Sequence, residues 1–175
     1  MTSSKRILVT ISVAVIIALA AVVALMVFDK SPDLLNSEFR VIVTNSMDGE
    51  PTEYDISTIP VNSLVAIHKM DGGSTETVHI GDVIGFRSET VHGNVYHRVI
   101  NIDPTSQIFT TKGDNTHSTE SIPFGDVNGK VVNVSPLAGQ AITYLQKNTL
   151  FVLAVIIILV VMVEAVSYVL RLGKE

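Results

Sequence analysis

The stretch "GDVIGFRSETVHGNVYHRVINID", residues 81–103, decides the fold class of this chain. It contains two short runs rich in Val, Ile and Phe, and the residues around these runs include Gly, Asn and Asp, which favour turns. Four similar runs lie elsewhere between residues 39 and 136, namely FRVIVT, SLVAIHKM, QIFTTKGD and GKVVNVSP. Helical periodicity is absent from this region until residue 137. We therefore expect a single mostly-β domain with a folded or barrel-like sheet.

A long apolar run precedes this region. Ile7 to Phe28 spans 22 residues without a charge, and as a helix it would be about 33 Å long, enough for a hydrocarbon core of about 30 Å. A cleaved signal peptide would instead have an apolar region of about 7–15 residues that ends at a small-residue cleavage site. This run is longer and ends in VFDKSPD. We therefore expect a retained transmembrane helix over residues 7–28.

A second apolar run, from Leu150 to Leu170, follows the β region and contains one charge, Glu164. Its length fits a transmembrane helix, and a buried core helix is the alternative. A carboxylate in the middle of a membrane is costly and usually faces protein, water or the interface. If the helix tilts, Glu164 lies near the far headgroups and needs no function. We expect a second transmembrane helix over residues 150–170.

Basic residues at the ends of the two runs predict their orientation. Lys5 and Arg6 precede the first run, whereas Arg171 and Lys174 follow the second. Basic residues gather on the cytoplasmic side of a membrane. The expected order is a cytoplasmic N-terminus (1–6), a span (7–28), an extracytoplasmic domain (29–148), a span (150–170) and a cytoplasmic tail (171–175). This arrangement predicts a multi-pass protein of the cell membrane.

Composition excludes several classes of function. The net charge is −5 and no basic stripe is present, so nucleic acid is not an expected partner. The chain has no cysteine, which excludes a thiol nucleophile, a disulfide framework and thiolate zinc sites. Its five histidines lack a close paired spacing and no HExxH string occurs. We therefore expect neither a metal nor a cofactor.

Ser46 is the first candidate for chemistry. It lies in RVIVTNSMDGEPT, where it ends an alternating apolar run and precedes the turn-like residues 47–49. A serine at the end of a strand is usually a turn former that hydrogen-bonds to its own backbone. This stretch alone leaves two interpretations open, a turn between strands and a nucleophile near a membrane.

His97 and two acids supply the other groups that hydrolysis by a serine would need. His97 lies in VYHRVI, where a histidine in a strand is more often a packing residue than a base. The stretch TTKGDNTHSTE, residues 110–120, reads first as a turn. It also carries Asp114 and Glu120, which are able to orient an imidazole. Serine, histidine and an acid are the ingredients of nucleophilic hydrolysis, which is recognised by geometry and not by sequence order.

Six strings occur in a fixed order along the chain: NSM, IPVNSLVAI, GDVIGF, YHRVI, FTTKGD and GKVV. Together they resemble type I signal peptidases, and in particular the serine–histidine branch found in archaea, the endoplasmic reticulum and some Gram-positive bacteria. The resemblance covers roughly Val41 to Pro136. It implies a membrane-bound serine endopeptidase that cleaves signal peptides from exported precursor proteins.

The resemblance assigns roles to particular residues. The serine of NSM, Ser46, would attack the scissile carbonyl, and His97 would be the general base where the bacterial branch has lysine. Asp114, in KGD, would support the histidine. A second acid, usually an aspartate a few residues later, would be Glu120 here, with Asp126 as its rival.

The oxyanion would be stabilised by the backbone N–H of Ser46 and the hydroxyl of Thr44, because the family often has Ser or Thr two residues before the nucleophile. The implied partners are signal peptides, the lipid bilayer and the Sec translocon. The stretch DGEPTEYDIST, residues 48–58, departs from many relatives because it lengthens the loop that follows the nucleophile.

Two other interpretations remain open. A lysine with a lowered pKa is an alternative base, and Lys69 and Lys112 both lie in strand-like contexts. A membrane-anchored binding module without catalysis would belong to a different class of function. The presence of Ser46, His97 and Asp114 within the ordered strings favours the enzyme.

Overall fold

The computed structural model describes residues 36–50, 52–70, 77–88 and 92–172. The chain divides into two compact units, of which one is residues 31–143 and the other contains the C-terminal segment from residue 144. The predicted first span and the residues before it lie outside the described residues, as does Lys174.

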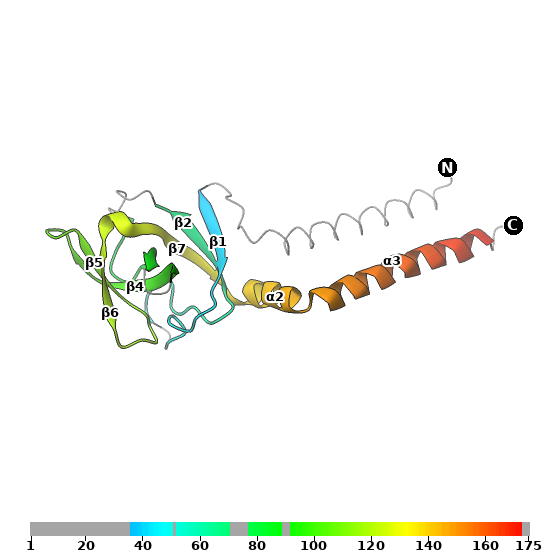
Figure 1. Ribbon diagram of the computed structural model, residues 1–175, viewed down its shortest axis with the longest axis horizontal. Helices are drawn as coiled ribbons and strands as arrows, with labels where there is room; N and C mark the ends of the chain where they lie inside the picture. Colours follow the sequence, from blue (N-terminus) through cyan, green and yellow to red (C-terminus); the bar gives the residue numbers. More distant parts are fainter. Residues whose placement is uncertain (1–35, 51, 71–76, 89–91, 173–175) are drawn as a thin grey trace. The chain divides into compact units, whose positions relative to one another are not determined.

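Seven strands form one antiparallel sheet in the first unit (Figure 1). They are β1 (Ser37–Val41), β2 (Leu64–Lys69), β3 (Val83–Ser88), β4 (Gly93–Asp103), β5 (Ile108–Lys112), β6 (Thr119–Pro123) and β7 (Val127–Ser135). Their order in the sheet is β1-β2-β7-β3-β4-β5-β6, so β1 and β6 are the edges. The prediction of a single mostly-β domain is therefore confirmed.

Both faces of the sheet bury apolar side chains, because successive residues of a strand point to opposite faces. On β3, Val83 belongs to one core cluster and the next residue, Ile84, belongs to the other. The first cluster also takes in Met47 and Ile59 from outside the strands. The pairing register shifts in three places, between β2 and β7, between β3 and β7 and between β4 and β5. Such irregularities bend strands and increase their twist.

Strand β6 was not among the predicted strands. Its sequence, TESIP, alternates between exposed and half-buried positions and contains no run of large apolar residues. Pairing with β5 places Thr111 opposite Glu120, so the strand depends on a partner outside its own sequence. Interpreting residues 110–120 as a turn is thus right only for the segment between these two strands.

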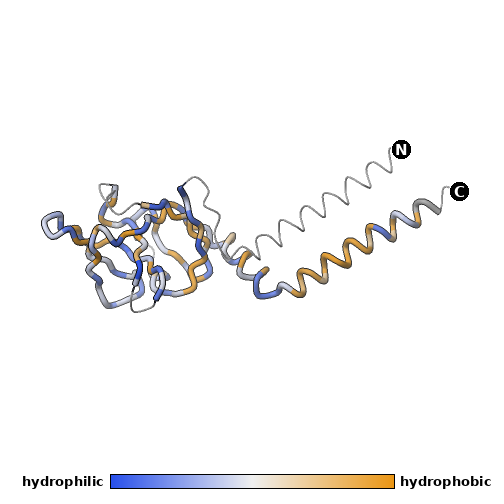
Figure 2. The backbone as a smooth tube through the Cα atoms, turned by 45° about the horizontal axis from the view of Figure 1, so that its top comes forward, coloured by the Kyte–Doolittle hydropathy of each residue, from blue (hydrophilic) through white to orange (hydrophobic). Residues whose placement is uncertain are grey.

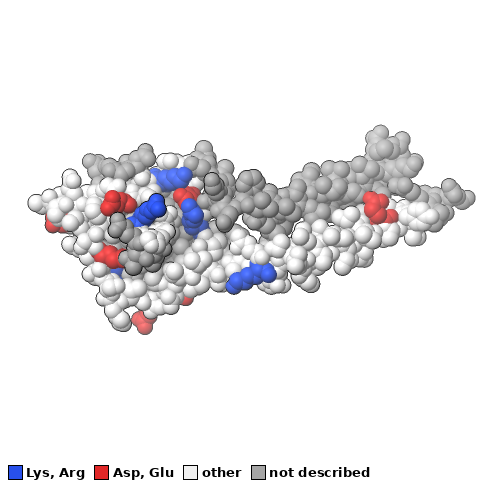
Figure 3. All heavy atoms as spheres, in the orientation of Figure 1, with Lys and Arg blue, Asp and Glu red and all other residues white. Residues whose placement is uncertain are grey.

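Two helices follow the sheet, α2 (Pro136–Lys147) and α3 (Thr149–Leu172). Proline suits the first position of a helix, where no intrahelical hydrogen bond is lost. Within α3, Thr149–Val169 is 21 residues long with a mean hydropathy of 3.0, which makes it long and apolar enough to cross a membrane. The hydrophobic colouring runs almost continuously along this helix (Figure 2). Charged side chains instead gather over the sheet domain on the face that Figure 3 shows.

Candidate active site

Ser46 lies in a short turn that follows β1, and buried residues fix both of its ends. Before it, the backbone N–H of Ile42 donates to the carbonyl of Ser63 at 2.9 Å. After it, the Met47 side chain is only 1% exposed, and the Met47 carbonyl accepts a hydrogen bond from the N–H of Ile59 at 2.9 Å. The turn between these fixed points leaves residues 43–45 exposed and Ser46 half-buried. The nucleophile candidate is therefore accessible on a firmly held backbone.

Gly113, which follows β5, brings the Ser46 turn close to His97. A Cβ atom at Gly113 would lie 2.7 Å from the Ser46 carbonyl oxygen and 3.0 Å from Nε2 of His97. The N–H of Asn115 also donates to the Ser46 carbonyl at 2.9 Å. Both groups approach the same glycine, and a side chain there would displace one of them. Sequence reasoning did not single out Gly113, although it lies in the KGD string.

The imidazole of His97 is held by Glu120 across strand β5. Nδ1 of His97, on β4, lies 2.7 Å from Oε2 of Glu120, on β6. The His97 side chain is 10% exposed, and its ring also meets the edge of Phe86 at a centroid distance of 6.0 Å. A carboxylate on Nδ1 favours the tautomer that carries its proton there. Nε2, which faces Gly113, is then free to accept a proton.

Asp114 is paired with Arg98 and not with the histidine. Its two carboxylate oxygens accept hydrogen bonds from Nε of Arg98 at 2.8 Å and from Nη2 at 2.6 Å. Both side chains are almost fully buried. His97 and Arg98 are consecutive on β4, so they point to opposite faces and meet different acids. Of the two predicted acids, Glu120 therefore contacts the histidine and Asp114 contacts the arginine.

The remaining predicted residues are placed as follows. Oγ1 of Thr44 lies 3.4 Å from Oγ of Ser46, at the limit of a hydrogen bond. Among the described residues no hydrogen bond joins Ser46 Oγ to His97; such contacts are often long before a substrate binds. Asp126 is exposed in the 3₁₀ turn η2 (Phe124–Asp126), and it is Glu120 that contacts the histidine. Lys69 ends β2.

An open hollow lies beside Gly113. Its lining consists of Glu50, Thr52, Ile100, Lys112, Gly113 and Asp114. Lys112, which was considered as an alternative base, therefore borders this hollow, while Nε2 of His97 lies beside Gly113. In the part of the chain that the structure describes, no group of three or more His, Cys, Asp or Glu side chains could hold a metal ion.

The segments thus converge into one arrangement: a half-buried serine, an imidazole with one nitrogen close to the glycine that also adjoins the serine turn, and a carboxylate on the other nitrogen. The residues predicted for the site did not include Arg98, which pairs with Asp114. The available signal was a charged residue next to His97 in a strand, since an arginine that is buried there needs an acidic partner. No protein-family model matches the chain, and no curated protein matches it.

Proposed function

We propose that this protein is a membrane-bound signal peptidase of the serine–histidine type, which cleaves signal peptides from exported precursors. The observation that carries the proposal is the closeness of both the Ser46 carbonyl and the His97 Nε2 atom to Gly113, with Glu120 on Nδ1. Three segments far apart in the sequence thus bring Ser46, His97 and Glu120 to one place, and their hydroxyl, imidazole and carboxylate are the groups that serine hydrolysis needs.

The reaction begins when Ser46 Oγ attacks the scissile carbonyl and His97 Nε2 accepts the hydroxyl proton. Glu120 keeps the imidazole oriented and stabilises the imidazolium that forms. The backbone N–H of Ser46 and the hydroxyl of Thr44 are the donors for the oxyanion. The imidazolium then gives its proton to the leaving amine. Water, deprotonated by the same histidine, releases the cleaved signal peptide from the acyl-enzyme.

The position of the serine suits an extended substrate. β1 is an edge of the sheet, and Val43, just beyond it, is 79% exposed. An edge strand can pair with an extended peptide through main-chain hydrogen bonds, while side-chain pockets select alternate residues of that peptide. The substrate would thus be held as an added strand next to Ser46, with the hollow beside Gly113 available for its side chains.

The proposed location is the membrane from which exported chains emerge. We propose that α3 crosses it, that residues 7–28 form a second span, and that the sheet domain is extracytoplasmic with a barrel-like sheet. A signal peptide has an apolar region that sits in the bilayer and a small-residue cleavage site near its surface. Holding the enzyme and the precursor in one membrane raises their effective concentration. The Sec translocon is the proposed source of these precursors.

The test uses the full-length protein in detergent, with a model precursor that carries a signal peptide. The wild-type protein is expected to cut after the small-residue site, as read by N-terminal sequencing of the product. Ser46→Ala and His97→Ala are each expected to abolish cleavage with the fold intact by circular dichroism. Ser121→Ala and His68→Ala, both at exposed positions on strands, are the matched controls and should cleave normally. Full activity of either site variant would refute the assignment.

A further inference from the structure

The lengthened loop after Ser46 closes on itself and returns to the serine turn. The N–H and the hydroxyl of Thr52 donate to the carbonyl of Ser57 at 3.2 and 3.1 Å. The hydroxyl of Thr58 lies 3.2 Å from the carbonyls of both Met47 and Gly49. The loop is thus closed by its own hydrogen bonds and is joined to the backbone that immediately follows the nucleophile.

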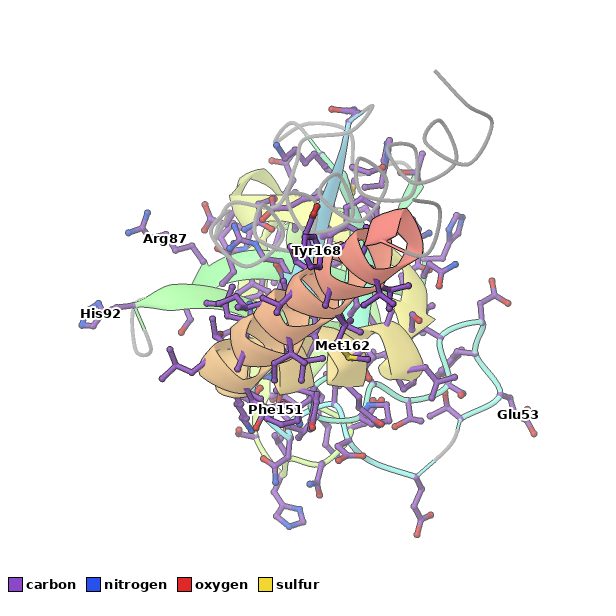
Figure 4. The ribbon with its side chains drawn as sticks, turned by 90° about the vertical axis from the view of Figure 1, so that its right-hand side faces the viewer. Glu53, Arg87, His92, Phe151, Met162 and Tyr168 are labelled. Atoms are coloured by element: carbon purple, nitrogen blue, oxygen red, sulfur yellow. The ribbon has the colours of Figure 1, made fainter. Side chains whose placement is uncertain are left out.

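Tyr54, in this loop, lies against Gly81 and Arg98. The Arg98 guanidinium carbon is 5.1 Å from the centroid of the Tyr54 ring, within the range of a cation–π contact. A Cβ atom at Gly81 would lie 2.3 Å from the ring, and Gly81 has a φ of +98°. Glycine is therefore needed there for both its backbone conformation and its lack of a side chain. The neighbouring Glu53 points away from the sheet domain (Figure 4).

Arg98 is held on several sides at once. Besides its two bonds to Asp114, its Nη1 donates to the Gly81 carbonyl at 2.7 Å and its Nη2 donates to the Ser57 carbonyl at 3.5 Å. The residue is only 3% exposed, and Tyr54 and Ser57 of the loop contribute to its surroundings. An ion pair in such surroundings is stronger than one in water, and removing a covering group lets water weaken it.

Asp114 joins Arg98 to the backbone beside the serine turn. It is joined to Gly113, whose neighbours are the Ser46 carbonyl and His97 Nε2. The backbone of Asp114 also lies against Gly49, where a Cβ would meet the Asp114 carbonyl oxygen at 2.9 Å. Asp114 is therefore in close contact with the backbone that adjoins both the serine turn and the histidine.

We infer that Tyr54 is a positioning residue for this site, acting through Arg98 and Asp114 on the Gly113 backbone between Ser46 and His97. The inference rests on the proposed function for its kinetic consequence, and its structural consequence can be measured without activity. The lengthened loop thus has a role in holding the site, which the sequence left undetermined.

The experiment compares Tyr54→Phe, Tyr54→Leu and Tyr54→Ala in the full chain. Phe keeps the aromatic face over the guanidinium, whereas Leu keeps apolar volume and loses the ring quadrupole. We expect kcat to fall about tenfold in the Leu and Ala variants with KM little changed, and to stay near the wild-type value in the Phe variant. Tyr144→Leu, at an exposed tyrosine on α2, is the matched control and should leave kcat unchanged.

The second readout is hydrogen exchange at the Asn115 amide, which donates to the Ser46 carbonyl. Exchange there should become faster in Tyr54→Leu and Tyr54→Ala, and should stay at the wild-type rate in Tyr54→Phe and Tyr144→Leu. Wild-type exchange in all the variants would overturn the inference, and so would equal losses of kcat in the Phe and Leu variants. If the wild-type protein cuts no precursor, the proposed function fails, and the exchange rates still decide the role of Tyr54.

Discussion

Nδ1 of His97 lies 2.7 Å from Oε2 of Glu120, although the two residues are 23 positions apart in the sequence. Strand β5 separates them in the sheet, because β4 and β6 pair with its two sides. The contact therefore depends on the pairing of three strands. It defines the orientation of the one imidazole nitrogen that approaches the Ser46 turn, and the first prediction follows from it.

Replacing Glu120 by Gln is expected to lower kcat by about a hundredfold or more, because the amide does not stabilise the imidazolium and can hold the wrong tautomer. The measurement is kcat on the model precursor. Asp126→Asn, at the exposed rival acid, is the control and should leave kcat unchanged. A larger loss in the Asp126 variant than in the Glu120 variant would reverse the assignment of the acid.

Gly113→Ala introduces a methyl group whose carbon would lie 2.7 Å from the Ser46 carbonyl oxygen and 3.0 Å from Nε2 of His97. Overpacking of this kind costs about 1–3 kcal/mol and moves the groups that cannot share the space. We expect a free energy of unfolding lower by that amount and a loss of kcat of more than about tenfold. Gly125→Ala, at an exposed glycine, should change neither quantity. A fully active Gly113→Ala variant would show that the two groups need not meet there.

Asp114→Ala leaves the guanidinium of Arg98 buried without its partner. The side chains of this pair are 4% and 9% exposed, and breaking a buried pair costs about 3–5 kcal/mol. Arg40 pairs with Glu38, and the Arg40 side chain is 47% exposed. Arg40→Ala should therefore lower the free energy of unfolding by about 1 kcal/mol or less. Urea unfolding of the two variants measures both values. Equal losses of stability would contradict the contrast between the buried and the exposed pair.

The raised pKa of Tyr96 predicts that the stability of the protein depends on pH in the alkaline range. Its burial in the core, with the nearby Glu38 carboxylate as a smaller cause, raises its pKa above the ordinary value of 10.0. The native state therefore keeps a proton that the unfolded state releases, so stability falls as the pH rises from about 10 through the native pKa. The stability of Tyr96→Phe should fall less steeply than that of the wild type over this pH range, as measured by the urea midpoint at successive pH values. Tyr144→Phe should follow the wild-type curve.

The membrane proposal for α3 is testable because the chain contains no tryptophan. Met162 on this helix is 57% exposed (Figure 4). In vesicles, Met162→Trp should fluoresce at shorter wavelength than Ser121→Trp on the exposed edge strand, and lipids with brominated chains should quench it more strongly. Equal quenching of the two tryptophans would argue against a transmembrane α3.

The sheet and the helix could be predicted from the sequence because their signals are local. β2, β3, β4 and β7 have short apolar runs bounded by turn residues, and α3 has an apolar run of sufficient length. β6 lacked such a run because it is a polar edge strand. The sequence also did not predict which acid pairs with His97 and which with Arg98, since Asp114 and Glu120 were each compatible with either partner.

The sequence by itself determined the mostly-β class, the long apolar C-terminal helix and the residue types from which a serine–histidine–acid site can be made. These properties follow from hydrophobic patterning and composition, which act over a few neighbouring residues. Only the tertiary structure decided that Glu120 meets His97, that Asp114 meets Arg98, and that Gly113 adjoins both the Ser46 turn and the imidazole. The reason is physical: strand pairing and the alternation of side chains between the two faces of a sheet decide which distant groups meet.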